Sequence, residues 1–179
     1  MAFPRPKRRY YNEEELYEYA VGSLARRMRT VAELKRLMRA RVEDAQSEYG
    51  QTLIELVIRR LKDRGYLNDS AYAASYSSLR RDNQKFGPQR VATDLKIKGV
   101  HGTVIEKAIA DAYSATPEET LARAFLRKKR TQKPGNQKEA ARIFRQLLRA
   151  GFRSRTAIAI LKKWNVDEEV LTALDGEQD

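Results

Sequence analysis

The chain of 179 residues contains no cysteine and a single histidine, His101. Without thiols there are no disulfides and no thiolate-bound metal, and a lone histidine supplies neither a metal-binding set nor a nucleophile pair. We therefore expect His101 to be a loop or capping residue. Glycine-rich stretches that would cradle the phosphates of a bound nucleotide are also missing. These absences argue against an enzyme and against any cofactor.

Long apolar segments are missing too, since no run approaches the ~20 residues that a membrane-spanning helix needs. The first residues, MAFPRPKRRYY, carry positive charge but lead into acidic residues without the apolar segment of a signal peptide. We interpret residues 1–11 as a flexible basic arm, with a tail of no function as the alternative. Together with the lack of cysteine, this predicts a soluble cytoplasmic protein.

Charge, by contrast, is abundant and unevenly distributed. The sequence has 36 Lys or Arg against 24 Asp or Glu, a net charge of +12 and a pI near 10.0. From Arg123 to Lys163 there are 14 basic residues and one acid, whereas the last 16 residues, from Trp164 onward, hold six acids and no base. The acidic end either stays solvated or folds back on the basic region. The excess of positive charge predicts a polyanion or an acidic protein surface as the partner.

Helix signals recur along the chain. Six segments place Asn or Thr three residues before Glu, the capping-box pattern of a helix start, at Asn12, Thr30, Thr52, Thr103, Thr116 and Asn136. Gly65, Gly99 and Gly151 each follow a basic last turn and precede an apolar residue that can fold back on it, as at helix ends. Apolar residues recur with a 3.6-residue period and never alternate over a useful length. We predict an all-α protein with helices at about 12–29, 30–43, 48–64, 69–83, 87–98, 102–114, 117–131, 136–150, 153–164 and 166–174.

The helices repeat in groups of three. One apolar-glycine pattern occurs twice at identical spacing, at Val91, Leu95, Gly99 and Val100 and again at Ile143, Leu147, Gly151 and Phe152. Leu34 begins a weaker copy 57 residues before Val91. We predict three tandem three-helix repeats in an elongated, curved molecule. They are repeat 1 (12–66), repeat 2 (67–115) and repeat 3 (116–165), followed by an acidic C-terminal helix or tail (166–179).

Basic clusters near helix ends are the candidate contact residues. Gly87 and Pro88 would leave the start of the following helix open to a phosphate, with Lys85 and Arg90 beside it. Basic residues at helix C-termini can also merely complement the helix dipole. The predicted contact surface comprises Arg80, Arg81, Lys85 and Arg90 in repeat 2, and Arg127, Lys128, Lys129, Arg130, Arg142, Arg145 and Arg149 in repeat 3.

Four aromatic residues surround the start of repeat 2: Tyr66, Tyr72, Tyr76 and Phe86. Such side chains can stack on bases or anchor a protein interface. Tyr72 and Tyr76 lie four residues apart on one predicted helix, a spacing that favours core packing for this pair.

Repeat 2 also carries a resemblance to a known family. The stretches GYLNDSAYA (65–73), FGPQRV (86–91) and LKIKGV (95–100) resemble the signature of the RecX family, bacterial regulators of the recombinase RecA. That signature reads G-Y-L-D-D-x-x-F/Y-A, followed by a helix that opens Y/F-G-P-x-R-I/V and ends K-G-I/V. Asn68 stands where the family usually has Asp. Weaker matches to the family occur at residues 32–34 and 149–152.

The resemblance implies three-helix repeats without a cofactor that bind in the helical groove of a RecA–DNA filament, where family members hinder ATP hydrolysis, strand exchange and filament growth. It implies the RecA filament as partner, with weak or indirect contact to single- or double-stranded DNA, and we expect a monomer. Two alternatives stay open. One is a DNA-binding module that uses the helix after Gly87 and Pro88 and acts without a recombinase, and the other is a helical scaffold for an acidic protein.

Overall fold

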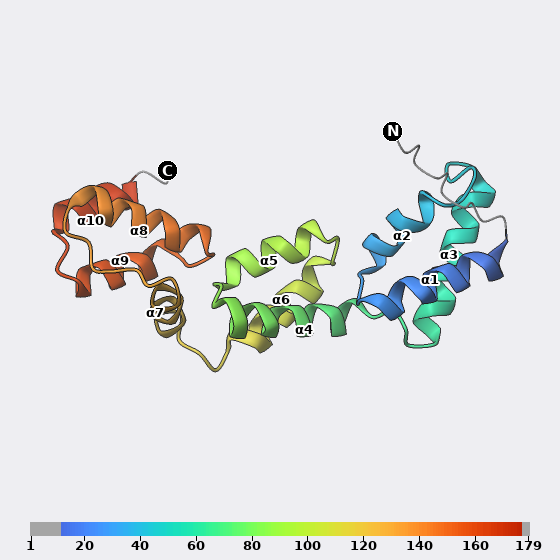
Figure 1. Ribbon diagram of the computed structural model, residues 1–179, viewed down its shortest axis with the longest axis horizontal. Helices are drawn as coiled ribbons and strands as arrows, with labels where there is room; N and C mark the ends of the chain where they lie inside the picture. Colours follow the sequence, from blue (N-terminus) through green and yellow to red (C-terminus); the bar gives the residue numbers. More distant parts are fainter. Residues whose placement is uncertain (1–11, 177–179) are drawn as a thin grey trace, which may run out of the picture. The chain divides into compact units, whose positions relative to one another are not determined.

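The structure, a computed structural model, describes residues 12–176, and these contain helices and no strand (Figure 1). The all-α prediction is therefore confirmed. The predicted basic arm at 1–11 lies outside the described residues. The elements are α1 (Glu13–Arg26), α2 (Val31–Arg39), α3 (Glu48–Asp63), α4 (Asp69–Leu79), the π-helical turn η1 (Arg80–Gln84), α5 (Pro88–Ile97), α6 (Gly102–Tyr113), α7 (Glu118–Lys128), α8 (Gln137–Arg149), α9 (Ser154–Lys163) and α10 (Glu168–Gly176).

Three of the six predicted caps begin helices. The side chains of Asn12, Thr30 and Asn136 accept hydrogen bonds from the backbone N–H three residues on, at 3.0, 3.1 and 2.9 Å. At Thr30 the capping box is complete, because the Glu33 carboxylate accepts from the Thr30 N–H at 3.3 Å. Each cap satisfies N–H groups that a first helical turn leaves without partners.

The other three predicted caps are wrong in position. Thr52 lies inside α3, whose start is capped by Ser47 through a 3.0 Å bond from the Gly50 N–H. Thr103 is already inside α6. Pro117, expected as the first helical residue after Thr116, is itself the N-cap of α7. The pattern is local, so it also occurs within helices where the N–H groups are already bonded.

All three predicted terminal glycines adopt positive φ, with values of 72° at Gly65, 76° at Gly99 and 90° at Gly151. This left-handed conformation costs glycine little and ends each helix. After Gly151, Phe152 is fully buried, as predicted. After Gly65, Tyr66 is instead 57% exposed, so its ring does not fold back on the helix.

The described chain forms two compact units. Unit 1 contains residues 12–72 and 97–101, and unit 2 contains residues 73–96 and 102–176. In unit 1, α1 and α2 pack against α3 around a core that includes Leu16, Leu34, Met38 and Leu61. In unit 2, α7, α8, α9 and α10 pack around a second core, which includes Leu121, Phe125, Phe144, Leu147, Phe152, Ile160 and Leu171. Burial of these apolar faces stabilises each unit.

In unit 1, the start of α2 meets the end of α5. The Thr30 hydroxyl donates to the Lys98 carbonyl at 2.7 Å, and the Asp69 carboxylate accepts from the Val31 N–H at 2.9 Å. A Cβ added to Gly99 would lie 2.4 Å from the Cβ of Ala32, so this close approach requires glycine. We call this contact the first junction.

In unit 2, the start of α5 meets the end of α8, here through backbone hydrogen bonds. The Gly87 N–H donates to the Ala150 carbonyl at 2.8 Å, and the Gln89 N–H donates to the Gly151 carbonyl at 3.2 Å. A Cβ on Gly151 would lie 2.2 Å from the Arg90 nitrogen. We call this contact the second junction. The prediction that the helix start at Gly87 and Pro88 is open to phosphate is therefore wrong, because backbone carbonyls already occupy its N–H groups.

Candidate functional site

Three of the predicted contact residues are engaged within unit 2. The Arg81 guanidinium pairs with Asp82 at 2.7 Å and donates to the Ala112 carbonyl. The Lys128 ammonium donates to the Asn83 carbonyl, which links α7 to η1. The hydrogen bond from Arg81 lowers the pKa of Asp82.

Arg90 is the third. Its guanidinium pairs with Asp94 at 3.2 Å, donates to the Arg149 carbonyl at 3.3 Å and lies 5.6 Å from the centre of the Phe86 ring. These bonds tie it to the second junction. Arg81, Lys128 and Arg90 therefore support the fold, whatever else they contact.

The remaining predicted residues of repeat 2 begin and end η1. The Arg80 guanidinium lies 4.8 Å from the centre of the Tyr76 ring, and the Tyr76 hydroxyl donates to Asp94 at 3.2 Å. Lys85 ends η1 with φ of 59° and is half-buried. Tyr72, predicted to be a core residue, is only 8% exposed. Of the four predicted residues of repeat 2, Arg80, Arg81 and Arg90 thus contact an aromatic ring or a carboxylate within the fold.

Repeat 3 presents its charge differently, because α8 is strongly amphipathic. Ile143 and Leu147 are buried on one face, whereas Arg142, Arg145 and Arg149 are exposed on the other. The Arg149 Nε donates to the Arg145 carbonyl at 3.3 Å, one turn earlier. The three arginines therefore form an exposed cationic stripe, as the sequence predicted.

The end of α7 adds further exposed cations. Arg127, Lys129 and Arg130 are all exposed, and Arg130 turns the chain with φ of 52°. The Lys129 ammonium lies 6.0 Å from the centre of the Phe125 ring. We call Arg127, Lys129, Arg130, Arg142, Arg145 and Arg149 the basic surface of repeat 3.

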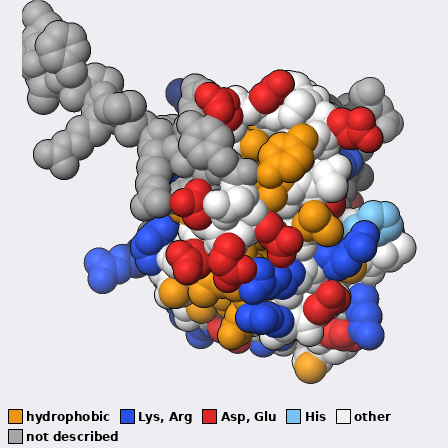
Figure 2. Space-filling model, turned by 90° about the vertical axis from the view of Figure 1, so that its right-hand side faces the viewer, with side chains coloured by type: hydrophobic (Ala, Val, Ile, Leu, Met, Phe, Trp, Pro, Cys, Tyr) orange, Lys and Arg blue, Asp and Glu red, His pale blue; other side chains and the backbone are white. Residues whose placement is uncertain are grey.

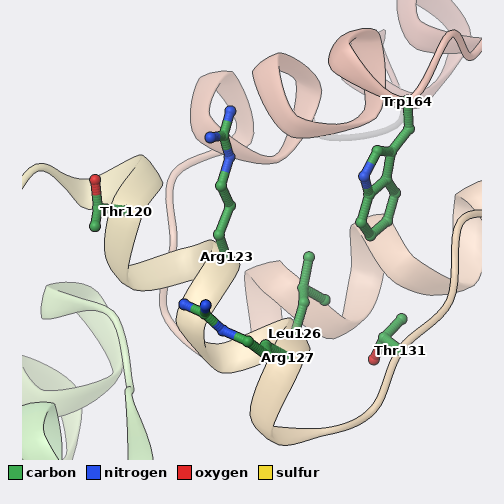
Figure 3. Close-up of a pocket in the computed structure, with 6 residues that line it drawn as sticks. All are labelled: Thr120, Arg123, Leu126, Arg127, Thr131 and Trp164. Atoms are coloured by element: carbon green, nitrogen blue, oxygen red, sulfur yellow. The ribbon is translucent and has the colours of Figure 1, made fainter.

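Beside this basic surface lies a pocket of about 540 Å³ (Figure 3), lined by Thr120, Arg123, Leu126, Arg127, Thr131 and Trp164. Sequence reasoning did not select Arg123 or Trp164. The available signal was that the only tryptophan of the chain directly follows two lysines. A flat aromatic ring beside cations is a common arrangement at nucleic-acid contacts.

Repeat 1 is nearly neutral by comparison. Residues 12–66 contain 11 basic and 10 acidic residues, whereas residues 116–165 contain 14 basic and three acidic residues. Much of the charge in repeat 1 is paired; for example, Arg60 binds Glu14 at 2.7 Å and stacks 3.9 Å from the centre of the Tyr17 ring. Figure 2 shows one face of the molecule, on which Asp and Glu side chains lie among Lys and Arg. Strong positive charge is therefore a property of repeat 3.

Other kinds of site find no support in the part of the chain described. Within residues 12–176, no group of His, Asp and Glu is arranged to hold a metal ion. None of the helices there is both long and apolar enough to cross a membrane. His101 is exposed, in the loop just before α6.

Comparison with known proteins identifies the family. A family model described as "RecX, second three-helix domain" matches residues 68–109. The chain is 34% identical over 160 residues to Regulatory protein RecX of Myxococcus xanthus (strain DK1622), covering 82% of this chain and 84% of that protein. The chain belongs to the RecX family. It is also 30% identical over 151 residues to Regulatory protein RecX of Geobacillus thermodenitrificans (strain NG80-2), covering 83% of this chain but only 53% of that relative.

Solved RecX structures have the same fold. The crystal structure of RecX from Lactobacillus salivarius matches with a TM-score of 0.70 at 21% identity, covering 86% of this chain and 96% of that one. A second crystal structure, of regulatory protein RecX, matches with a TM-score of 0.68 at 20% identity, covering 84% and 71%.

Proposed function

We propose that this RecX-family chain is a non-enzymatic regulator that binds the RecA–DNA filament and inhibits its ATP hydrolysis and growth. The observation that carries the proposal is the basic surface of repeat 3 on a chain whose relatives are named regulatory proteins. A recombinase filament offers DNA phosphates along its length, and a cationic surface on a helical frame binds such a polyanion.

The alternative function, a DNA-binding module that acts without a recombinase, has less support. It required the start of α5 as an open phosphate site, and the Gly87 and Gln89 N–H groups there are bonded to carbonyls of repeat 3. DNA contact through exposed arginines stays compatible with either mode, because arginine pairs with phosphate in protein-bound and naked DNA alike.

The test is a titration of the DNA-dependent ATPase of the cognate recombinase on single-stranded DNA. We expect substoichiometric chain to slow ATP hydrolysis. No effect over a broad concentration range would refute the proposal. A triple variant with Arg127, Lys129 and Arg130 replaced by Glu leaves Lys128 and its bond to Asn83 intact. A much higher concentration of this variant than of the wild type should be needed for the same inhibition of ATP hydrolysis.

A matched control reverses three exposed basic residues of repeat 1, Arg26, Arg36 and Arg39, each near a helix C-terminus as the tested residues are. It changes the net charge by the same amount. Inhibition by this control should stay close to that of the wild type. Equal weakening by both triple variants would mean that total charge, rather than the basic surface of repeat 3, determines binding.

A further inference from the structure

The pocket beside the basic surface joins two kinds of chemistry. Figure 3 shows the Trp164 side chain reaching from the end of α9 towards α7, which carries Arg123 and Arg127; in this view the Arg127 side chain extends away from the indole. Thr120 and Thr131 add hydroxyl groups to the lining. The volume of about 540 Å³ lies within the roughly 300–1,000 Å³ usual for ligand pockets.

The charge of the pocket is only partly neutralised. Glu119 accepts from Arg123 Nη2 and from Lys163 Nζ, each at 2.5 Å, so one carboxylate serves two cations. The hydrogen bond from Lys163, with Arg123 nearby, lowers the pKa of Glu119 and keeps it ionised. Arg127 is exposed and has no acidic partner among residues 12–176. Two arginines line the pocket and no carboxylate does, so the pocket favours a negatively charged ligand.

The indole supplies the second kind of chemistry. Trp164 is half-buried and packs against the core of repeat 3, which holds the ring in place. Its neighbour Asn165 adopts φ of 55°, which turns the chain immediately after the ring. The indole N–H has no hydrogen-bond partner among the described residues. An aromatic ring in a pocket that two arginines also line provides a stacking surface for a base and donors for a phosphate.

We propose that this pocket binds one unpaired nucleotide of single-stranded nucleic acid, with its base against Trp164 and the phosphates on either side of it on Arg123 and Arg127. Arg123 also donates to Glu119, so Arg127 is the arginine whose charge is fully available to a phosphate. An acidic peptide would satisfy the arginines but leave the indole face uncovered, and a duplex keeps its bases stacked and unavailable. The inference deepens the proposed function, on which it rests, by naming where the strand of the filament is contacted.

The experiment uses the full chain without any recombinase. Because Trp164 is the only tryptophan, its fluorescence reports on this pocket alone when excited where tyrosine does not absorb. We expect single-stranded oligo-dT to quench the emission. A duplex of the same length and an abasic single strand, which carries phosphates without bases, should quench far less. Equal binding of the abasic strand would overturn the role of the base.

Variants assign the contributions, with labelled oligo-dT anisotropy as the readout. Trp164→Leu should weaken binding by roughly 5- to 150-fold, the equivalent of about 1–3 kcal/mol of stacking, and Trp164→Phe should recover part of it. Arg127→Glu should weaken binding strongly. The control is Arg59→Glu, an exposed arginine of α3 with the same charge change, and it should bind as the wild type does. Circular dichroism confirms folding of each variant.

Two outcomes separate this inference from the function on which it rests. If polyglutamate quenches Trp164 and oligo-dT does not, the pocket binds an acidic protein and the nucleotide proposal is wrong. If Arg127→Glu and Trp164→Leu leave oligo-dT binding unchanged while the wild type still slows the recombinase ATPase, the pocket fails and the regulatory function stands.

Discussion

Replacing Gly151 by alanine tests whether the second junction holds unit 2 together. Alanine at a positive φ costs about 1–2 kcal/mol. Its Cβ would lie 2.2 Å from the Arg90 nitrogen and 2.4 Å from the Arg90 Cβ, so α5 must move away. That movement breaks the bonds from the Gly87 and Gln89 N–H groups, each with a net value of about 0.5–1.5 kcal/mol. The sum is a loss of about 2–5 kcal/mol.

The assay is thermal unfolding followed by circular dichroism. For a chain of this size each kcal/mol shifts Tm by about 2–4 °C, so Gly151→Ala should lower Tm by about 10 °C. Gly65→Ala is the matched control, since Gly65 also ends a helix at positive φ but nothing lies within 4 Å of its added Cβ. It should lower Tm by about 4 °C. Equal shifts for the two variants would refute the reasoning.

A double-variant cycle sharpens the test. A Cβ on Gly87 would lie 2.2 Å from the Gly151 carbonyl oxygen, so Gly87→Ala disrupts the same junction from the other side. Because the two changes act on shared contacts, the double variant should lose less stability than the sum of the single variants. Full additivity would mean that each glycine acts independently.

Three further predictions concern single side chains. Thr30→Val removes the hydroxyl that caps α2 and donates to Lys98, so chemical denaturation should show a loss of about 2 kcal/mol, with Thr30→Ser close to the wild type. Burial raises the pKa of Glu33, but hydrogen bonds from Lys98 and the Thr30 N–H outweigh this effect, so the pKa is lowered overall. The ionised Glu33 therefore stabilises the fold above the unfolded pKa of about 4.3, and this stabilisation is lost as pH falls through the folded pKa. The denaturation midpoint should fall more steeply with acid in the wild type than in Glu33→Gln. Tyr113→Phe removes the 2.9 Å bond to the Phe86 carbonyl and should cost about 1 kcal/mol; because burial raises the pKa of Tyr113, an ultraviolet titration should lose an ionisation above the ordinary tyrosine range.

Local chemistry explains which parts of the fold could be predicted from the sequence. Gly65, Gly99 and Gly151 were identified as helix ends because a left-handed residue after a basic turn depends only on its neighbours. The 3.6-residue pattern likewise predicted the buried face of α8. Thr52 was misread because a capping pattern within a helix is indistinguishable in sequence from one at its start.

The candidate site was less predictable because its residues find partners far along the chain. Nothing local indicates that the N–H of Gly87 bonds to Ala150, or that Lys128 donates to Asn83. Composition located the positive charge in repeat 3 correctly, but which cations are used inside the fold depends on tertiary contacts. Trp164 was overlooked for the same reason, since its role depends on α7 lying opposite it.

The two junctions have a consequence for how charge can vary in such a chain. The second junction is held by backbone hydrogen bonds and glycines, and the first adds the side chains of Thr30 and Asp69. The exposed arginines of α8 take part only through the Arg149 carbonyl. The exposed charges of α8 can therefore change without loss of the contacts at either junction. Residues 12–66 are nearly neutral and residues 116–165 are strongly cationic, so the two stretches suit different partners through their exposed side chains.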